Sequence, residues 1–265
     1  MLRLTACIEM MFKEYDYNKR PAAAADIGLD GVEFWGWASK DLAAIGDAAK
    51  AAGMPITSCS IDTKDEACQE AWRKFGMLDL SNVQVFVDMV GESIMAMKPL
   101  DIPTLIVCTG NTLPGRTRQL QEEAVLACLT AAAPIAQQHG IQLVLEPLNP
   151  VIDHIGHYLN TSAQAFHILK IVNHPSVKLL FDIYHQQVTE GNVINNIVQN
   201  IDLIGHFHVA DSPGRHQPGT GEMNYHNIFH AIEDAGFKQW VGLEYSPTIE
   251  TEKSLLEVMK YAHHS

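Results

Sequence analysis

The sequence predicts a single (β/α)₈ barrel, and three observations support this fold class. Short apolar runs alternate with helical segments along the chain, which is typical of a parallel sheet with crossover helices. Eight such runs fit within 265 residues, and about 250 residues is a usual length for a closed eight-stranded barrel. No low-complexity linker or charge block divides the chain, so we expect one domain over residues 1–265.

Eight segments rich in valine, isoleucine and leucine are predicted to be strands, and most are bounded by glycine, proline or asparagine. They are residues 3–9, 31–35, 55–61, 104–110, 141–148, 177–183, 204–211 and 241–247. An open doubly wound sheet is the structural alternative, but it usually carries a glycine-rich phosphate motif after an early strand. The first run is followed by "EMMFKEYDYN" instead, which favours the closed barrel.

Five segments between these runs have helical spacing and are predicted to be helices. They are residues 20–28, 39–53, 118–140, 161–173 and 224–236. We predict Ser39 as the N-cap of the second, because a serine hydroxyl can accept a hydrogen bond from the first turn. Several of the five end at a glycine, as helices commonly do.

Composition narrows the classes of partner. The net charge of −13 argues against nucleic acid or an anionic membrane, since both require a cationic surface. The five cysteines form no CxxC pair, which fits a reducing compartment. The N-terminus does not resemble a signal peptide, and no apolar run has the length of a membrane span. We therefore expect a cytoplasmic protein that acts on a small molecule.

Potential metal ligands stand at the ends of the last four predicted strands. They are Glu146, Asp182, His208 and Glu244, spaced about one strand–helix unit apart. A single glutamate after an apolar run is usually a solvated strand end, but four ligands at matching depth converge at the mouth of a barrel. Burying so much negative charge without a cation would be costly. Three carboxylates and one imidazole favour Mg²⁺ or Mn²⁺ over structural zinc.

Further polar and aromatic residues are predicted at the same face. His185 and Arg215 are candidates for binding substrate oxygens, although each also has a structural reading, as a surface histidine or an ion-pair partner. Glu33 and Trp35, near the end of the second strand, are also candidates for binding substrate. Trp35 and Trp37 could form an apolar wall above the barrel mouth, or an oligomer contact.

His206 alternates with His208, and we predict that it points the other way and is structural. Asp211 is predicted to brace the loop that follows. The roles of the remaining polar residues near the site stay open: Asn149, Asp153, His154, His157, His216 and Glu222. His263 and His264 are expected to form a solvated tail.

These residues also resemble a known family. Their order resembles that of the xylose-isomerase-like barrel superfamily of sugar isomerases and epimerases: Glu146, Asp182 with His185, His208, Arg215 and Glu244. The segments "FHVADSPGRHQPGTGEMNY", "GLDGVEFWGW" and "LEPLN" are most similar to the hydroxypyruvate isomerase family. The resemblance extends over most of the chain, and the segment of the seventh strand is its most specific part.

The resemblance implies a divalent metal held by the four strand-end residues, with Glu146 and Glu244 as the acid/base pair. It implies 1,2-proton transfer between hydroxypyruvate and tartronate semialdehyde. Ketose 3-epimerases and 2-oxo-tetronate isomerases share the scaffold and stay open as alternatives, as does a metal-stabilised binding barrel that is not an enzyme. Endonucleases acting on abasic DNA also belong to the superfamily, but the acidic charge argues against that activity here. A homo-oligomer is also expected from the resemblance.

Overall fold

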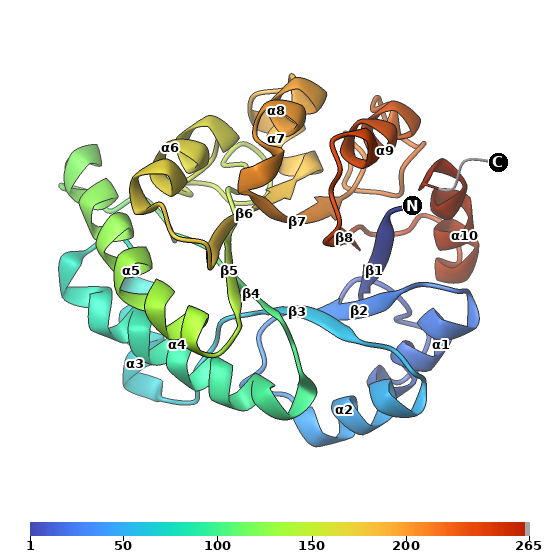
Figure 1. The fold of residues 1–265 in the computed structure, drawn as a ribbon, viewed down its shortest axis with the longest axis horizontal. Helices are drawn as coiled ribbons and strands as arrows, with labels where there is room; N and C mark the ends of the chain where they lie inside the picture. The colour runs from blue at the N-terminus through green and yellow to red at the C-terminus, as the bar shows by residue number, and fades with distance from the viewer. Residues whose placement is uncertain (263–265) are drawn as a thin grey trace.

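The structure, a computed structural model that describes residues 1–262, is a closed barrel of eight parallel strands ringed by helices (Figure 1). The strands follow one another around the barrel in sequence order, and the last pairs with the first. They are β1 Arg3–Cys7, β2 Gly31–Phe34, β3 Ile56–Ser60, β4 Thr104–Val107, β5 Gln142–Leu145, β6 Val177–Asp182, β7 Ile204–Val209 and β8 Trp240–Leu243. The predicted fold class is confirmed. The predicted tail, His263 and His264, lies outside the described residues.

Ten α-helices and four short 3₁₀-helices connect the strands within residues 1–262. The α-helices are α1 Arg20–Asp26, α2 Leu42–Ala51, α3 Glu66–Phe75, α4 Val83–Met97, α5 Arg118–Gln138, α6 Ser162–Val172, α7 Ile183–Thr189, α8 Val193–Gln199, α9 Tyr225–Asp234 and α10 Thr251–Ala262. The 3₁₀-helices are η1 Tyr17–Lys19, η2 Leu80–Asn82, η3 Lys98–Leu100 and η4 Ile201–Leu203. In this described part of the chain, no helix is both long and apolar enough to cross a membrane.

All five predicted helices are present, as α1, α2, α5, α6 and α9, but the N-cap predicted for α2 is wrong. Asp41 caps this helix by accepting a hydrogen bond of 3.0 Å from the Ala44 backbone. The chain first turns between Trp37 and Lys40, so Ser39 lies in that turn. The helix α4 was not predicted, since its valines favour strands locally, but its apolar face packs into the core through Phe86, Val90 and Ile94.

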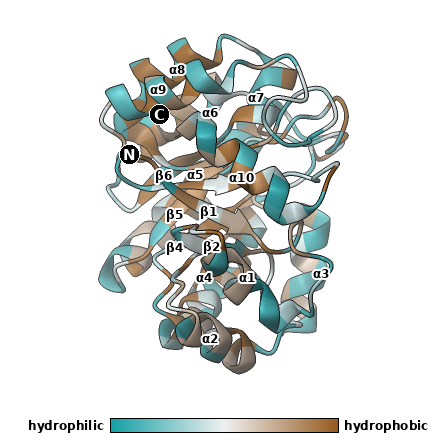
Figure 2. Ribbon diagram, turned by 90° about the vertical axis from the view of Figure 1, so that its right-hand side faces the viewer, coloured by the Kyte–Doolittle hydropathy of each residue, from teal (hydrophilic) through white to brown (hydrophobic). Residues whose placement is uncertain are grey.

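The main apolar core lies between the barrel and its helices. Hydrophobic and hydrophilic residues intermix along those helices (Figure 2), as expected where one face is buried and the other solvated. Ile106, Val144 and Leu180 form a separate buried cluster. Their chain neighbours belong to the main core, so by strand alternation these three face the barrel interior from β4, β5 and β6. Elsewhere the interior is polar, with Glu33 and His206 buried on β2 and β7.

The strands are shorter than predicted at their carboxyl ends. Regular pairing on β5 and β8 stops at Leu145 and Leu243. Glu146 and Glu244 are therefore the first residues beyond their strands, and their backbone N–H groups still donate to Val107 and to Val209 of the neighbouring strands. These bonds hold both carboxylates at the rim of the barrel.

Candidate active site

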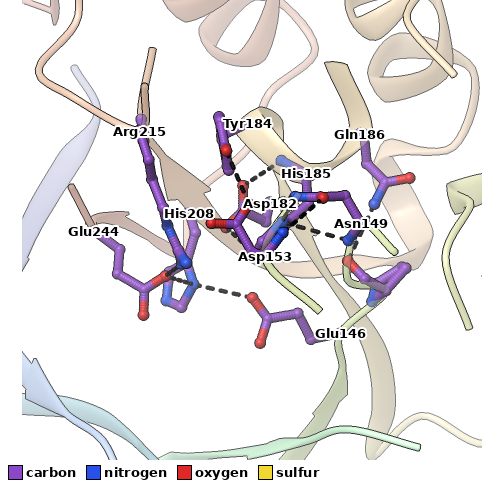
Figure 3. A network of polar contacts seen from close by, with 12 residues as sticks. Glu146, Asn149, Asp153, Asp182, Tyr184, His185, Gln186, His208, Arg215 and Glu244 are labelled. Carbon is purple, nitrogen blue, oxygen red and sulfur yellow. Dashed lines mark hydrogen bonds and ion pairs between the residues drawn. The ribbon is translucent and has the colours of Figure 1, made fainter. Parts of the chain in front are cut away.

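The four strand-end residues meet at the carboxyl end of the barrel. One ligand atom from each lies within 4.8 Å of the other three, and all four side chains are buried. Figure 3 shows the carboxylates of Glu146 and Glu244 on either side of the His208 ring. The Nδ1 atom of His208 lies 3.3 Å from Glu146 Oε1 and 3.4 Å from Glu244 Oε2.

The donor set fits a divalent cation. Three carboxylates crowd around one imidazole in a buried space, where ionised groups lose most of their hydration. Burial raises the pKa of the Asp182 carboxyl even though Arg215 and His208 act against this. Such an oxygen-rich group with one imidazole suits a hard or borderline divalent metal. A second group with ligand spacing, Glu33 with His206 and His208, lies beside it.

Two residues from the loops after β7 and β2 hold the Glu244 carboxylate. Arg215 donates to Oε2 over 2.5 Å, and the Trp35 indole donates to Oε1 over 2.7 Å. Burial opposes ionisation of Glu244, but the positive charges of His208 and Arg215 outweigh it and hold its pKa below the usual value. The carboxylate is thus ionised and fixed in orientation. Trp35 is 43% exposed, so its ring also forms part of the wall of the barrel mouth.

His185 is held as a neutral donor. Its Nδ1 atom accepts from the Asn149 side-chain amide over 2.7 Å, which assigns the ring proton to Nε2. Burial, with the charge of Arg215, lowers its pKa to about 4. The Nε2 atom is buried without a hydrogen-bond partner and lies 3.6 Å from Asp182 Oδ2. It is therefore available to a substrate oxygen.

Sequence reasoning left the residues behind His185 without roles. Asn149 also donates to Asp153 Oδ2 over 2.7 Å, and the Tyr184 hydroxyl donates to the same oxygen over 2.8 Å. Asp153 thereby orients the side-chain amide of Asn149, and this amide in turn orients the His185 ring. Asn149 follows Glu146 by three residues, which places it on the same rim of the barrel. This spacing is the sequence signal that could have indicated its role.

The loop after β7 is braced by Asp211, as its position in the sequence suggested. Its carboxylate accepts from the backbone of Gly219 at 2.8 Å and of Gly221 at 2.9 Å. This folds the loop back so that Arg215, with a positive φ of 55°, reaches Glu244. His216 bonds the Ser246 carbonyl over 2.8 Å and so ties the loop to the segment after β8. Glu222 lies on the surface near Gln187.

The prediction that His206 points away from His208 is wrong. Residues two apart on a strand face the same side, and both rings contact the carboxylate of Glu33. Glu33 approaches His208 at Nε2, whereas Glu146 and Glu244 approach at Nδ1. The His208 ring therefore lies between Glu33 and the carboxylates of Glu146 and Glu244.

His157, on the loop after β5, is expected to make the protein sensitive to acid. Burial lowers its pKa to about 3 from the usual 6.5, so the unfolded chain binds a proton that the folded protein does not. The stability is then complete above pH 6.5 and declines as the pH falls towards 3. We expect His157→Gln to reduce the loss of unfolding free energy over this range by up to about 1 kcal/mol per pH unit. Urea unfolding at several pH values measures this. An unchanged pH slope would contradict it.

Comparisons with known proteins agree with this geometry. The family model described as xylose isomerase-like TIM barrel matches residues 21–262. Hydroxypyruvate isomerase of Escherichia coli (strain K12) is 32% identical over 255 residues, which cover 96% of this chain and 97% of that protein. The 2-oxo-tetronate isomerase of Cupriavidus necator is 30% identical and covers 96% of each chain. The crystal structure titled AP endonuclease, family 2, from Brucella melitensis is 31% identical, with a TM-score of 0.89, and covers 98% of this chain and 99% of that one.

A buried, oxygen-rich group at the carboxyl end of a (β/α)₈ barrel places the chain in the class of TIM-barrel enzymes, which carry their catalytic residues at this end. Within this class, the chain belongs to the xylose isomerase-like TIM barrel family. The predicted family is confirmed, and so is the prediction of an isomerase.

Proposed function

We propose that the chain interconverts hydroxypyruvate and 2-hydroxy-3-oxopropanoate (tartronate semialdehyde) by proton transfer between neighbouring carbons. The observation that carries this proposal is the meeting of Glu146 and Glu244 at one imidazole, in a site with the ligand set of a divalent cation. The full-length similarity to a hydroxypyruvate isomerase supports the choice of substrate.

The reaction removes a proton from carbon 3 of hydroxypyruvate and returns one to carbon 2, while the hydroxyl proton on oxygen 3 moves to oxygen 2. A bound divalent cation, Mg²⁺ or Mn²⁺, would stabilise the negative charge that develops on these two oxygens. The residues that would hold it are Glu146, Asp182, His208 and Glu244.

Glu146 and Glu244 are the proposed acid/base pair. They directly follow β5 and β8, and both approach His208 at Nδ1 (Figure 3). A substrate between them would present its two reacting carbons to different carboxylates. One carboxylate accepts the proton from carbon 3, and the other donates a proton to carbon 2. The lowered pKa of Glu244 keeps its carboxylate ionised, which is the form that accepts a proton.

Three residues are proposed to bind the substrate. The Nε2–H group of His185 donates to a substrate oxygen, because it has no partner within the protein. Arg215, whose Nε atom is also without a partner, is placed to attract the substrate carboxylate while it holds Glu244. Trp35 closes the side of the site.

A substrate panel with added Mg²⁺ or Mn²⁺ tests the proposal. We expect hydroxypyruvate to be turned over with a kcat/KM at least about tenfold above those of 2-oxo-tetronates and free ketoses. Preference for a 2-oxo-tetronate would favour the second candidate function, which the similar relative from Cupriavidus necator supports. Epimerisation of a ketose, or cleavage of abasic DNA in a parallel assay, would contradict the proposal.

We also propose a homo-oligomer in the cytoplasm that binds no nucleic acid. Val151, Ile152 and Ile155, on the loop after β5, are each more than half exposed, which suits contact with a second copy of the chain. The net charge of −13 would repel a nucleic acid backbone.

A further inference from the structure

A buried polar cluster lies behind His208, on the side away from Glu146 and Glu244. At its centre is Glu33 of β2, which is 2% exposed. Its Oε2 atom accepts from the Ser58 hydroxyl over 2.9 Å and lies 2.9 Å from His206 Nε2. Its Oε1 atom lies 3.1 Å from His208 Nε2, at ion-pair distance, and neither of these two buried atoms has another hydrogen-bond partner. Burying a carboxylate at this depth costs free energy unless the charge is paired or hydrogen-bonded. We therefore ask what role this buried cluster has.

The barrel is shaped to let Glu33 reach His208. The strands β1 and β8 stand between β2 and β7, and the position of closest approach on β8 is Gly242. A Cβ atom at Gly242 would lie 2.3 Å from Glu33 Oε1 and 2.7 Å from His208 Cδ2. Both distances are shorter than side chains tolerate. Because glycine has no side chain, position 242 leaves room for the Glu33 carboxylate beside the His208 ring.

The two nitrogens of His208 face different carboxylates. A ring nitrogen that faces an unshared carboxylate carries the proton, and the other then offers its lone pair to a metal. When a cation takes the place of the Nδ1 proton, Glu33 keeps a proton on Nε2, and Nδ1 offers its lone pair on the side of Glu146 and Glu244. His206 and Ser58 hold Glu33 in turn.

We propose that Glu33 is a positioning residue that acts through His208, fixing the ring and its tautomer so that Nδ1 serves as the ligand atom for the catalytic cation. This inference rests on the metal site of the proposed function. Glu33 itself does not touch the substrate, because the His208 ring stands between them. The cluster of Glu33, His206 and His208 is a hydrogen-bonded support for one metal site, and it is not a second metal site.

Titration calorimetry of Mn²⁺ binding to the full chain tests this inference. We expect Glu33→Ala to weaken the Kd about 10- to 100-fold, as loss of an outer carboxylate usually does. Glu33→Gln should weaken it less, because the amide oxygen can still accept from Nε2. Gly242→Ala keeps Glu33 in the sequence, but its methyl group would occupy the space of the Glu33 carboxylate. This variant should also raise the Kd. With saturating Mn²⁺, the variants should lose kcat more than they change KM for hydroxypyruvate.

Thr57→Val is the matched control, because Thr57 is buried on β3 next to Ser58 and its hydroxyl bonds to the Val32 carbonyl and the Thr5 hydroxyl rather than to Glu33. It should lower the melting temperature yet leave the Kd for Mn²⁺ unchanged. An unchanged Kd in folded Glu33→Gln and Gly242→Ala would overturn the inference. So would two Mn²⁺ ions per chain, one of them lost in Glu33→Gln. If the parent binds no divalent metal, the proposed function itself fails, and the inference fails with it.

Discussion

Replacement of Glu244 by glutamine (Glu244→Gln) should lower kcat for hydroxypyruvate by about 10²- to 10⁴-fold, the usual contribution of a general acid or base. The amide keeps the size of the side chain, and its oxygen can still accept from Trp35 or Arg215. It cannot accept a proton at neutral pH. Because its lowered pKa keeps Glu244 ionised, the carboxylate is able to accept a proton, and this substitution removes that capacity.

The measurement must separate loss of the base from loss of the metal, since Glu244 is also a proposed ligand. We would determine the metal content of the variant and measure kcat with saturating Mg²⁺ or Mn²⁺. The control is Glu222→Gln, the same chemical change on an exposed loop residue that contacts Gln187, and it should leave kcat unchanged. A metal-loaded Glu244→Gln enzyme as fast as the parent would show that the acid/base assignment is wrong.

Removal of divalent metal with a chelator should abolish at least about 99% of turnover while the barrel stays folded. Stabilisation of the charge on the substrate oxygens is worth several kcal/mol, and each 1.36 kcal/mol is a factor of about ten in rate. The fold depends on the core between barrel and helices and on the pairing of β1 with β8. We therefore expect the circular dichroism spectrum to be retained, with a lower melting temperature because the buried carboxylates then repel one another.

Re-addition of Mg²⁺ or Mn²⁺ should restore activity, and the more effective of the two identifies the preferred cation. Calcium is a useful control, since it binds oxygen ligands but prefers more of them at longer distances. A barrel that unfolds on chelation would favour the metal-stabilised binding protein. Full activity in the chelated protein would rule out the role proposed for the cation.

The fold could be predicted because its signals are local. Alternating apolar runs and helical segments recur along the chain, and neighbouring strands in the sequence are neighbours in the barrel. The position of Glu146 or Asp182 at the end of such a run follows from the same pattern. The prediction failed where packing overrides propensity, as in the valine-rich helix α4, or where a turn delays a helix start, as at Ser39.

The sequence by itself determined the barrel and the residue types at its carboxyl rim. Strand periodicity is a local pattern, and the order of the strands in the barrel is their order in the sequence. Only the tertiary structure decided which atoms of those residues face one another. Glu33 and His206 are 173 positions apart, and Trp35 and Glu244 are 209 apart. Such pairs meet only when the barrel closes, and the approach of Glu33 to His208 depends on the absence of a side chain at Gly242. The orientation of the His208 ring therefore depends on the closed barrel, and no local sequence pattern predicts it.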